Sequence, residues 1–588
     1  DVVIANPNGI TCNGCGFINT VRATLTSGTP QLFDGALTGF DVRGGAVGFE
    51  GTGANMQDTA RFDVIAGAIR LNAEIQGRDL NLVAGHHQVA YADLALTGND
   101  ATPISSPEFA ISSSAVGGIY GDRIRLIAND AGVGVHLDAP VAAQLGSVDM
   151  DVNGSLRFTR VSATDDVTIS AHGIVADGAA TAGDHLDLTA DTSIHLAAET
   201  SEARHIDVNA QHLQIDTDAA LTGDALVANL HSIDNSGVIR IDEANISVAT
   251  TLDNHGVIEG QNLTLSAADI GNADGSIVAT DRLMVTVGDY VHRGEVQAGE
   301  LVLNSAGDIL VEQGSEWRLA GSADFTASGA LINAGILSSV EAMTISAEAL
   351  VNDGSLATQR DLTVNATYVT NFTDSLMLAG NSACFSGNDV YNAGDLYALT
   401  DIVIRGLSGD AADIVVNEGG FIGTLNGDIS IHADEVINTG VGEYLGSIEW
   451  GEASVSWPDD GRGESYNEDC FLRNRDDSCR ARAWRDSTRT QYIPDDQKQN
   501  PDLLPVSGVI LAGGNLTLDA HILRNLHSLL GAWQTTTINI HAGTDGEAGR
   551  IENLGYDVAL INETRTDSSW YVQTSGDLEE NRKYTYTT

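Results

Sequence analysis

The feature that most restricts the fold of this chain is an apolar-Asn-x-Gly step that recurs through its middle. A typical copy reads Leu-Val-Asn-Asp-Gly at residues 350–354. The asparagines of the step are Asn235, Asn254, Asn272, Asn333, Asn352, Asn371, Asn392, Asn417 and Asn438. We place Arg293 and Gln313 in the two slots that lack Asn, so that successive spacings run from 18 to 25 residues. A spacing this regular indicates one structural unit repeated along the chain.

The stretches between the steps have the pattern of short strands. Residues 262–266 and 343–346 alternate apolar residues with Thr, Ser or Asn, which is typical of a strand with one buried face. About 20 residues per repeat leave no room for a crossover helix. We therefore predict an all-β chain that folds as a right-handed parallel β-helix, a solenoid in which like positions stack from coil to coil. The stacked asparagines would form a side-chain ladder, and an antiparallel sandwich array is the alternative.

The repeat breaks near residues 446–505 and resumes with Asn515 and with the steps at Asn525 and Asn553. We interpret the break as an irregular insertion in the β-helix. It concentrates Trp and Arg, the residue types that dominate binding hot spots. The candidate partner-binding residues are Trp450, Trp457, Arg473, Arg475, Arg480, Arg482, Trp484, Arg485 and Arg489. The alternative is a solvated loop whose arginines neutralise nearby acidic coils.

The charge of the chain limits its partners. Of its 588 residues, 81 are Asp or Glu and 29 are Lys or Arg, which gives a net charge of −52. Nucleic acid and anionic lipid would repel such a surface, so we expect no nucleic-acid partner. No apolar run reaches the length of about 18 residues that a membrane-spanning helix needs.

The cysteines are few and odd in number. Cys12 lies three residues before Cys15, and Cys470 nine residues before Cys479. We expect local disulfides within these two pairs, which fits an oxidising, extracytoplasmic setting. Reduced thiols are the alternative for the first pair, whose loop is tight. No second pair stands at zinc-ligand spacing, so we predict no metal site and no cofactor.

The N-terminal residues Asn6, Pro7, Asn8, Gly9 and Ile10 form a concentrated turn signal, because Pro fixes φ and Asn-Gly accepts left-handed conformations. This motif closely resembles the Asn-Pro-Asn-Gly-Ile motif of the two-partner secretion domain, which begins filamentous haemagglutinins and contact-dependent growth inhibition exoproteins. Residues 110–127 and 131–135 resemble the end of the same domain. Members of that family carry an N-terminal cap and a further Asn-Pro-Asn element before the motif. Neither precedes it here, so we expect the chain to be a trimmed piece that lacks the start of the domain.

The resemblance and the repeat together predict four regions. Residues 1–145 would be the C-terminal part of the secretion domain, which is also called the haemagglutination activity domain, and 146–445 would be β-helix of about 20-residue repeats. Residues 446–505 would be the insertion, and 506–588 would hold resumed coils and an irregular end.

The resemblance implies export through an outer-membrane β-barrel partner to the cell surface of a Gram-negative bacterium. The protein would be a secreted adhesin-like stalk, or the shaft of a contact-dependent growth inhibition protein, with a receptor on a host or neighbouring cell. We hypothesise that the chain threads through the pore unfolded and that each emerging coil docks on the coil before it, which biases movement outward.

Catalysis is the competing reading, because β-helices also support secreted carbohydrate-active enzymes. Such sites use carboxylate pairs for general acid and base chemistry. Adjacent acidic pairs such as Asp165-Asp166 carry little information in so acidic a chain. His86-His87 is a possible metal pair, but we expect a loop, or one side chain inward and one outward. We therefore predict that the protein is not an enzyme.

Overall fold

The structure, a computed structural model, describes residues 1–98, 107–440, 507–543 and 547–554. It also places the backbone of two short antiparallel pairs, β48 (Ile448–Glu449) with β49 (Thr488–Arg489) and β55 (Tyr571–Gln573) with β56 (Lys583–Thr585). The chain divides into two compact units, residues 1–280 and 281–588. All regular elements in the described ranges are strands, and no helix there is long and apolar enough to cross a membrane.

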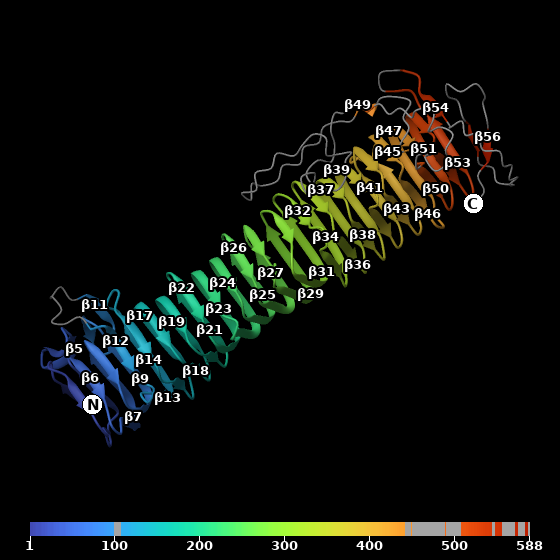
Figure 1. The fold of residues 1–588 in the computed structure, drawn as a ribbon. Helices are drawn as coiled ribbons and strands as arrows, with labels where there is room; N and C mark the ends of the chain where they lie inside the picture. The colour runs from blue at the N-terminus through green and yellow to red at the C-terminus, as the bar shows by residue number, and fades with distance from the viewer. Residues whose placement is uncertain are drawn as a thin grey trace. The chain divides into compact units, whose positions relative to one another are not determined.

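The first unit is a parallel β-helix, whose stacked strands form three series (Figure 1). The first series contains β1 (Val2–Ala5), β3 (Arg22–Thr26), β7 (Ala54–Ala66), β9 (Ile75–Ala84), β14 (Arg123–Ala128), β17 (Val148–Phe158), β19 (Val167–Ala176), β21 (His185–Ala190), β23 (Glu199–Ile215), β24 (Ala219–Asn235), β25 (Val238–Val248) and β27 (Val257–Ser266). The second adds β2 (Ile10–Cys12), β6 (Ala46–Phe49), β8 (Ala68–Leu71), β12 (Phe109–Ser113), β15 (Gly134–Leu137), β22 (Ser193–Leu196), β26 (Thr251–Asn254) and β28 (Asp269–Gly271). The third adds β13 (Ile119–Gly121), β16 (Val141–Ala143), β18 (Val161–Ala163) and β20 (Ala180–Ala182).

The second unit is built in the same way. Its first series contains β30 (Tyr290–His292), β32 (Ile309–Val311), β35 (Ala330–Asn333), β37 (Met343–Asn352), β39 (Leu362–Asn371), β42 (Asp389–Asn392), β45 (Ala412–Glu418), β47 (Ile429–Thr439), β51 (Leu516–Leu526) and β54 (Arg550–Leu554). The second adds β31 (Glu295–Ser305), β34 (Ser322–Ala327), β41 (Ala383–Ser386), β44 (Ile402–Arg405) and β53 (Thr536–Ile540). The third contains β33 (Glu316–Leu319), β36 (Ile336–Ser339), β38 (Ser355–Thr358), β40 (Leu376–Ala379), β43 (Asp395–Ala398), β46 (Phe421–Thr424), β50 (Val509–Ala512) and β52 (Leu529–Ala532). The boundary between the units falls within β29 (Ser276–Val287).

Every second side chain along a strand points inward, and these side chains fill the narrow interior of the β-helix. Along β17 the residues are buried and exposed in strict turn, as a strand with one inner face requires. Val148 pairs with Val167, and Val167 with Leu186, so that aliphatic side chains form columns through successive coils. All three are fully buried, and such burial is the main source of stability in the fold. The predicted parallel β-helix is confirmed.

Stacked asparagines form a buried ladder in each unit. In the first unit, the Asn235 amide nitrogen donates to the Asn254 oxygen at 2.7 Å, and Asn254 donates to Asn272 at 2.6 Å. In the second unit the same bond, at 2.7–2.9 Å, joins each asparagine to the next along the column. The members of this second column are Asn333, Asn352, Asn371, Asn392, Asn417, Asn438, Asn525 and Asn553.

The assignment of Arg293 and Gln313 to the slots without Asn is wrong by one or two residues. The strand register aligns Asn333 with Val311, and Val311 with His292. The slot faces the interior, where Val311 and His292 are 0% and 1% exposed. A charged Arg or a polar Gln would be costly there, whereas Val and a neutral His are tolerated. Burial lowers the pKa of His292 to about 4, which keeps its ring uncharged.

The ladder continues across residues 441–506. Asn438 on β47 donates to Asn525 on β51 at 2.9 Å, and the two strands pair in parallel from Ile429–Leu516 to Thr439–Leu526. The coil that ends at Gly440 and the coil that follows Gly508 are therefore stacked neighbours. Coils therefore follow the break in the described residues, while the predicted domain boundaries stay predictions.

A small antiparallel sheet extends from the first unit. Its strand order is β11 (Leu96–Gly98), β10 (His87–Ala90), β5 (Ala36–Asp41) and β4 (Thr29–Phe33). Phe40 and Val89 from this sheet pack with Ile65, Val83 and Ile127 of the β-helix in one buried cluster. The sheet thus covers the outer surface of the early coils and removes it from water.

Candidate functional site

The residues of the N-terminal motif form a compact turn at the start of the first unit. The Asn6 side chain donates to the Gly9 carbonyl at 2.8 Å and accepts from the Asn8 backbone N–H at 3.1 Å. The Asn6 backbone N–H donates to the Thr26 carbonyl at 2.9 Å, which ties the turn to the next coil. Ile10 then begins β2 opposite Val47. Asn6, Pro7 and Asn8 are exposed, so the folded turn presents them to solvent.

Glycine is required where this turn stacks on the coil above. Gly9 has a φ of 110°, and a Cβ there would lie 2.7 Å from the Ala46 carbonyl oxygen. Gly45 in the next coil has a φ of 76°, and its Cβ would lie 2.5 Å from the Pro7 carbonyl oxygen. Both positions combine a left-handed backbone with a close backbone approach, which only Gly accepts without strain.

The predicted cysteine pairs have different outcomes. A disulfide joins Cys12 and Cys15, directly after the motif, and Cys12 is fully buried. Cys470, Cys479 and the Trp and Arg residues predicted for the insertion lie outside the residues whose side chains the structure describes. Their roles stay predictions.

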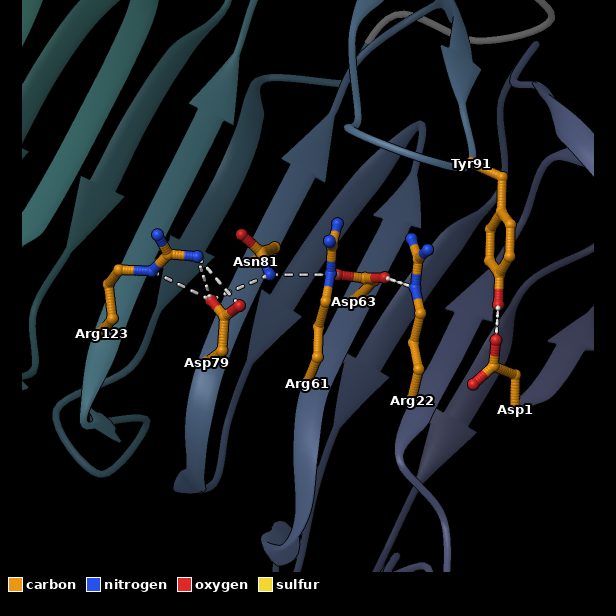
Figure 2. A network of polar contacts seen from close by, with 8 residues as sticks. All are labelled: Asp1, Arg22, Arg61, Asp63, Asp79, Asn81, Tyr91 and Arg123. Atoms are coloured by element: carbon orange, nitrogen blue, oxygen red, sulfur yellow. Dashed lines mark hydrogen bonds and ion pairs between the residues drawn. The ribbon is translucent and has the colours of Figure 1, made fainter.

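Behind the motif, a polar network crosses the outer face of the first coils (Figure 2). The Asp63 carboxylate is fully buried and accepts from Arg22 at 2.6 Å, from Arg61 at 2.9 Å and from Asn81 at 3.1 Å. Asn81 also donates to Asp79 at 3.3 Å, and Asp79 accepts a two-pronged contact from Arg123. These side chains come from strands β3, β7, β9 and β14, so the network ties four coils together.

The antiparallel sheet closes one end of this network. The Arg22 guanidinium lies 3.7 Å from the centre of the Tyr91 ring, a cation–π contact, and the Tyr91 hydroxyl donates to Asp1 at 3.2 Å. The Arg22 side chain is only 11% exposed as a result. A charge so enclosed depends on Asp63 for compensation.

His86 and His87 meet on one carboxylate. His86 lies in the bend before β10, and His87 begins that strand. The Asp130 carboxylate contacts the His86 ring at 2.5 Å, accepts from the His86 backbone N–H at 2.8 Å and lies 3.4 Å from the His87 ring. We expected either a loop or one side chain inward and one outward. The bend at His86 matches the loop, and strand alternation begins only at His87.

Acid should weaken the first unit through Asp130. Burial alone would raise the pKa of Asp130, but hydrogen bonds from His87 and His86 outweigh it and lower the pKa from 3.8 to about 2. The folded-state pKa lies below the unfolded one, so the stabilisation is complete above pH 4 and is lost as the pH falls toward 2. We expect Asp130→Asn to lower the free energy of unfolding by about 1–2 kcal/mol at neutral pH, and to reduce the further loss of stability between pH 4 and pH 2. Urea unfolding monitored by circular dichroism at several pH values measures both effects. An equal loss of stability with acid in the parent and the variant would contradict the prediction.

Sequence reasoning missed the network and Asp130 because their members are far apart in the sequence. Arg22 and Asp63 are 41 residues apart, and His86 and Asp130 are 44 apart. Both separations exceed the repeat of about 20 residues because the antiparallel sheet lengthens the early coils. The only available signal was Asp63 itself, a carboxylate between the buried strand residues Phe62 and Val64.

Comparisons with known proteins agree with the motif. Residues 1–158 match the family model of the TPS secretion domain, and our boundary at residue 145 stays a prediction. A protein named 16S rRNA endonuclease CdiA from Enterobacter cloacae subsp. cloacae is 31% identical over 459 residues, which cover 75% of this chain and 13% of the relative. A Toxin CdiA from Yersinia pestis is 42% identical over 155 residues, 26% of this chain and 5% of the relative. A tRNA nuclease CdiA from Escherichia coli strain NC101 is 36% identical over 204 residues, 34% of this chain and 6% of the relative. No solved structure gives a significant match.

These comparisons correct one prediction. We expected a protein that is not an enzyme, yet several relatives are named as nucleases. Their activities lie in C-terminal toxin domains outside the matched region, which spans 13% or less of each relative described above. A β-helix sequence carries no signal of a catalytic domain that forms from other residues, so the coils neither predict nor exclude one. A carbohydrate-active enzyme is not favoured.

Proposed function

Because the chain belongs to the two-partner secretion exoproteins of the contact-dependent growth inhibition and filamentous haemagglutinin type, we propose that its N-terminal coils are the export signal and its later coils the shaft of a toxin-delivery protein. Exoproteins of this type are secreted to the surface of Gram-negative bacteria. The partner in export would be a two-partner outer-membrane β-barrel transporter. The shaft would carry a C-terminal toxin domain, of which the relatives' nucleases are examples, toward a neighbouring cell.

The turn at Asn6–Gly9 is the observation that carries this proposal. It is exposed, it is fixed by its own side-chain hydrogen bonds, and it stacks on the next coil through two glycines. Such a turn offers a transporter a rigid recognition element as soon as two coils have formed. The coils that follow need only stack, because each presents the same edge to the next.

Loss of the turn should stop export. We expect Asn6→Ala, which removes both side-chain hydrogen bonds of the turn, to reduce surface-exposed protein at least tenfold when the chain is produced with its transporter. Asn245→Ala is the matched control, because Asn245 is an exposed strand residue far from the motif. Protease accessibility on intact cells measures the exported fraction. Equal export of the two variants would refute the assignment of the signal.

We further propose that residues 446–505 bind the receptor on the target cell. The region holds three of the chain's six Trp residues and a concentration of Arg in an otherwise acidic sequence. It is inserted between two coils that stack directly, so its removal need not disturb the shaft. The acidic shaft itself is expected not to bind nucleic acid.

Deletion of residues 446–505 should abolish binding to target cells while export and the Asn438–Asn525 stacking persist. Flow cytometry with labelled protein measures cell binding, and protease accessibility on the producing cells measures export. Unchanged binding by the deleted protein would favour the solvated-loop alternative. A loss of both binding and export would instead indicate a role in the shaft.

A further inference from the structure

Three metal-ligating side chains from three successive coils converge on the outer face of the second unit. They are His432 on β47, Asp519 on β51 and His541 just after β53. One ligand atom from each lies within 4.8 Å of the other two. The strand register explains the convergence, because His432 pairs with Asp519 and the His541 backbone N–H donates to the Ala520 carbonyl.

The His541 ring is held in the orientation that metal binding needs. Its Nδ1 lies 3.3 Å from the Ala542 carbonyl, which can only accept, so Nδ1 carries the proton. The lone pair therefore sits on Nε2, which lies 3.5 Å from the Asp519 carboxylate. A histidine ligand ordinarily donates its other nitrogen to a backbone carbonyl in this way. The His521 ring, stacked on His541, bonds to the His541 carbonyl at 3.0 Å and steadies the same segment.

We propose that His432, Asp519 and His541 bind one divalent transition-metal ion of the zinc type. Two imidazoles and one carboxylate are a ligand set that such ions prefer, with an open position for water. Tetrahedral zinc with bonds of 2.0–2.1 Å separates its ligand atoms by roughly 3.3 Å. The 3.5 Å between His541 and Asp519 is close to that separation, and the His432 ligand atom lies within 4.8 Å of both.

The three side chains are partly exposed, so an ion can enter without local unfolding. Within the described ranges, no other set of three His, Cys, Asp or Glu side chains converges as closely. His185 and His205 also stack on neighbouring coils, but each ring lies beside its own carboxylate, Asp207 and Asp184. That pair is a natural control for histidines that share a column without forming a site.

The bound ion would link three successive coils and stabilise their stacking. Among the described strands, β53 pairs only with β51, and its residues Thr536–Asn539 are exposed. An ion that binds only the folded arrangement stabilises it in proportion to its occupancy. The site therefore secures the coils that follow the 441–506 segment. This role is independent of the export signal proposed above.

Zinc titration of the metal-free full chain by calorimetry tests the proposal. We expect one tight equivalent, a tenfold or greater loss of affinity in His541→Ala and in His432→Ala, and unchanged binding in His205→Ala. Cobalt substitution should give the visible absorption of a tetrahedral site in the parent and in His205→Ala, and none in His541→Ala. Hydrogen exchange in β53 should slow on addition of zinc in the parent and in His205→Ala, and stay unchanged in His541→Ala.

Controls keep the outcome decisive. Circular dichroism in chelator shows whether each variant folds, and His541→Gln and His432→Gln replace any alanine variant that does not. If the variant His432→Gln/Asp519→Asn/His541→Gln folds and retains the tight equivalent and the cobalt spectrum, the site assignment is wrong. Absence of any tight equivalent in the parent overturns it equally.

Discussion

Replacement of Asp63 by Ala should lower the free energy of unfolding of the N-terminal unit by about 3–5 kcal/mol. The Asp63 carboxylate is fully buried and is the acceptor for Arg22, Arg61 and Asn81. Without it, the Arg22 guanidinium stays enclosed beneath Tyr91 with no carboxylate beside it. An uncompensated buried charge is among the costliest defects a single substitution can create.

Hydrogen exchange of the amides in β3, β7 and β9 measures this loss, because exchange reports the opening free energy of individual strands. Asp149→Ala is the matched control, since Asp149 faces Arg125 in a solvent-exposed pair at 3.6 Å. Exposed pairs contribute about 0–1 kcal/mol, so the control should change little. Equal effects of the two substitutions would mean that the network adds nothing beyond an ordinary surface pair.

Asn352→Leu should lower the free energy of unfolding of the second unit by about 2–4 kcal/mol. Asn352 is fully buried, accepts from Asn333 at 2.7 Å and donates to Asn371 at 2.7 Å. Its amide also bonds to the Leu376 carbonyl on the next coil at 3.0 Å. Leucine has a similar volume to Asn but no polar side-chain atoms. The Asn371 side-chain oxygen would therefore lose its hydrogen bond from residue 352 while buried, which weakens the contact between the two coils.

Hydrogen exchange in β35, β37 and β39 measures the effect, with Asn426→Leu as control because Asn426 lies exposed in a turn. The loss should be largest in the strands beside residue 352 and should fade with distance along the stack, since each coil contacts only its neighbours. A uniform loss over the whole unit, or none, would contradict the ladder's role in joining adjacent coils.

Much of the fold was predictable because the β-helix repeats its chemistry at nearly constant spacing. The Asn steps and the alternating strands each predicted the same coil, and Asn333, Asn352 and Asn371 lie in one column. The register failed only at Arg293 and Gln313, where no asparagine marks the column. Spacing alone cannot fix the register of that column to within one or two residues. Burial can, because a slot that faces the interior excludes a charged Arg.

The candidate sites were less predictable because they join residues at irregular separations. Asp519 is 87 residues from His432, with the whole 441–506 segment between them, and their pairing follows only from the stacked coils. The Asp63 network and Asp130 likewise depend on the antiparallel sheet, which interrupts the repeat. The exposed N-terminal turn was the exception, since its residues are adjacent and carry a resemblance to known exoproteins.

The uninterrupted ladder from Asn438 to Asn525 has an evolutionary consequence. Its 2.9 Å hydrogen bond is the same contact that joins coils with no inserted residues between them. The stacking of two coils at this turn therefore does not depend on the length of chain that connects them. Such a turn lets one segment be lengthened, replaced or diversified under selection while the scaffold stays constant. If residues 446–505 bind the receptor as proposed above, exchange at this single junction would change the target with no compensating change elsewhere in the solenoid.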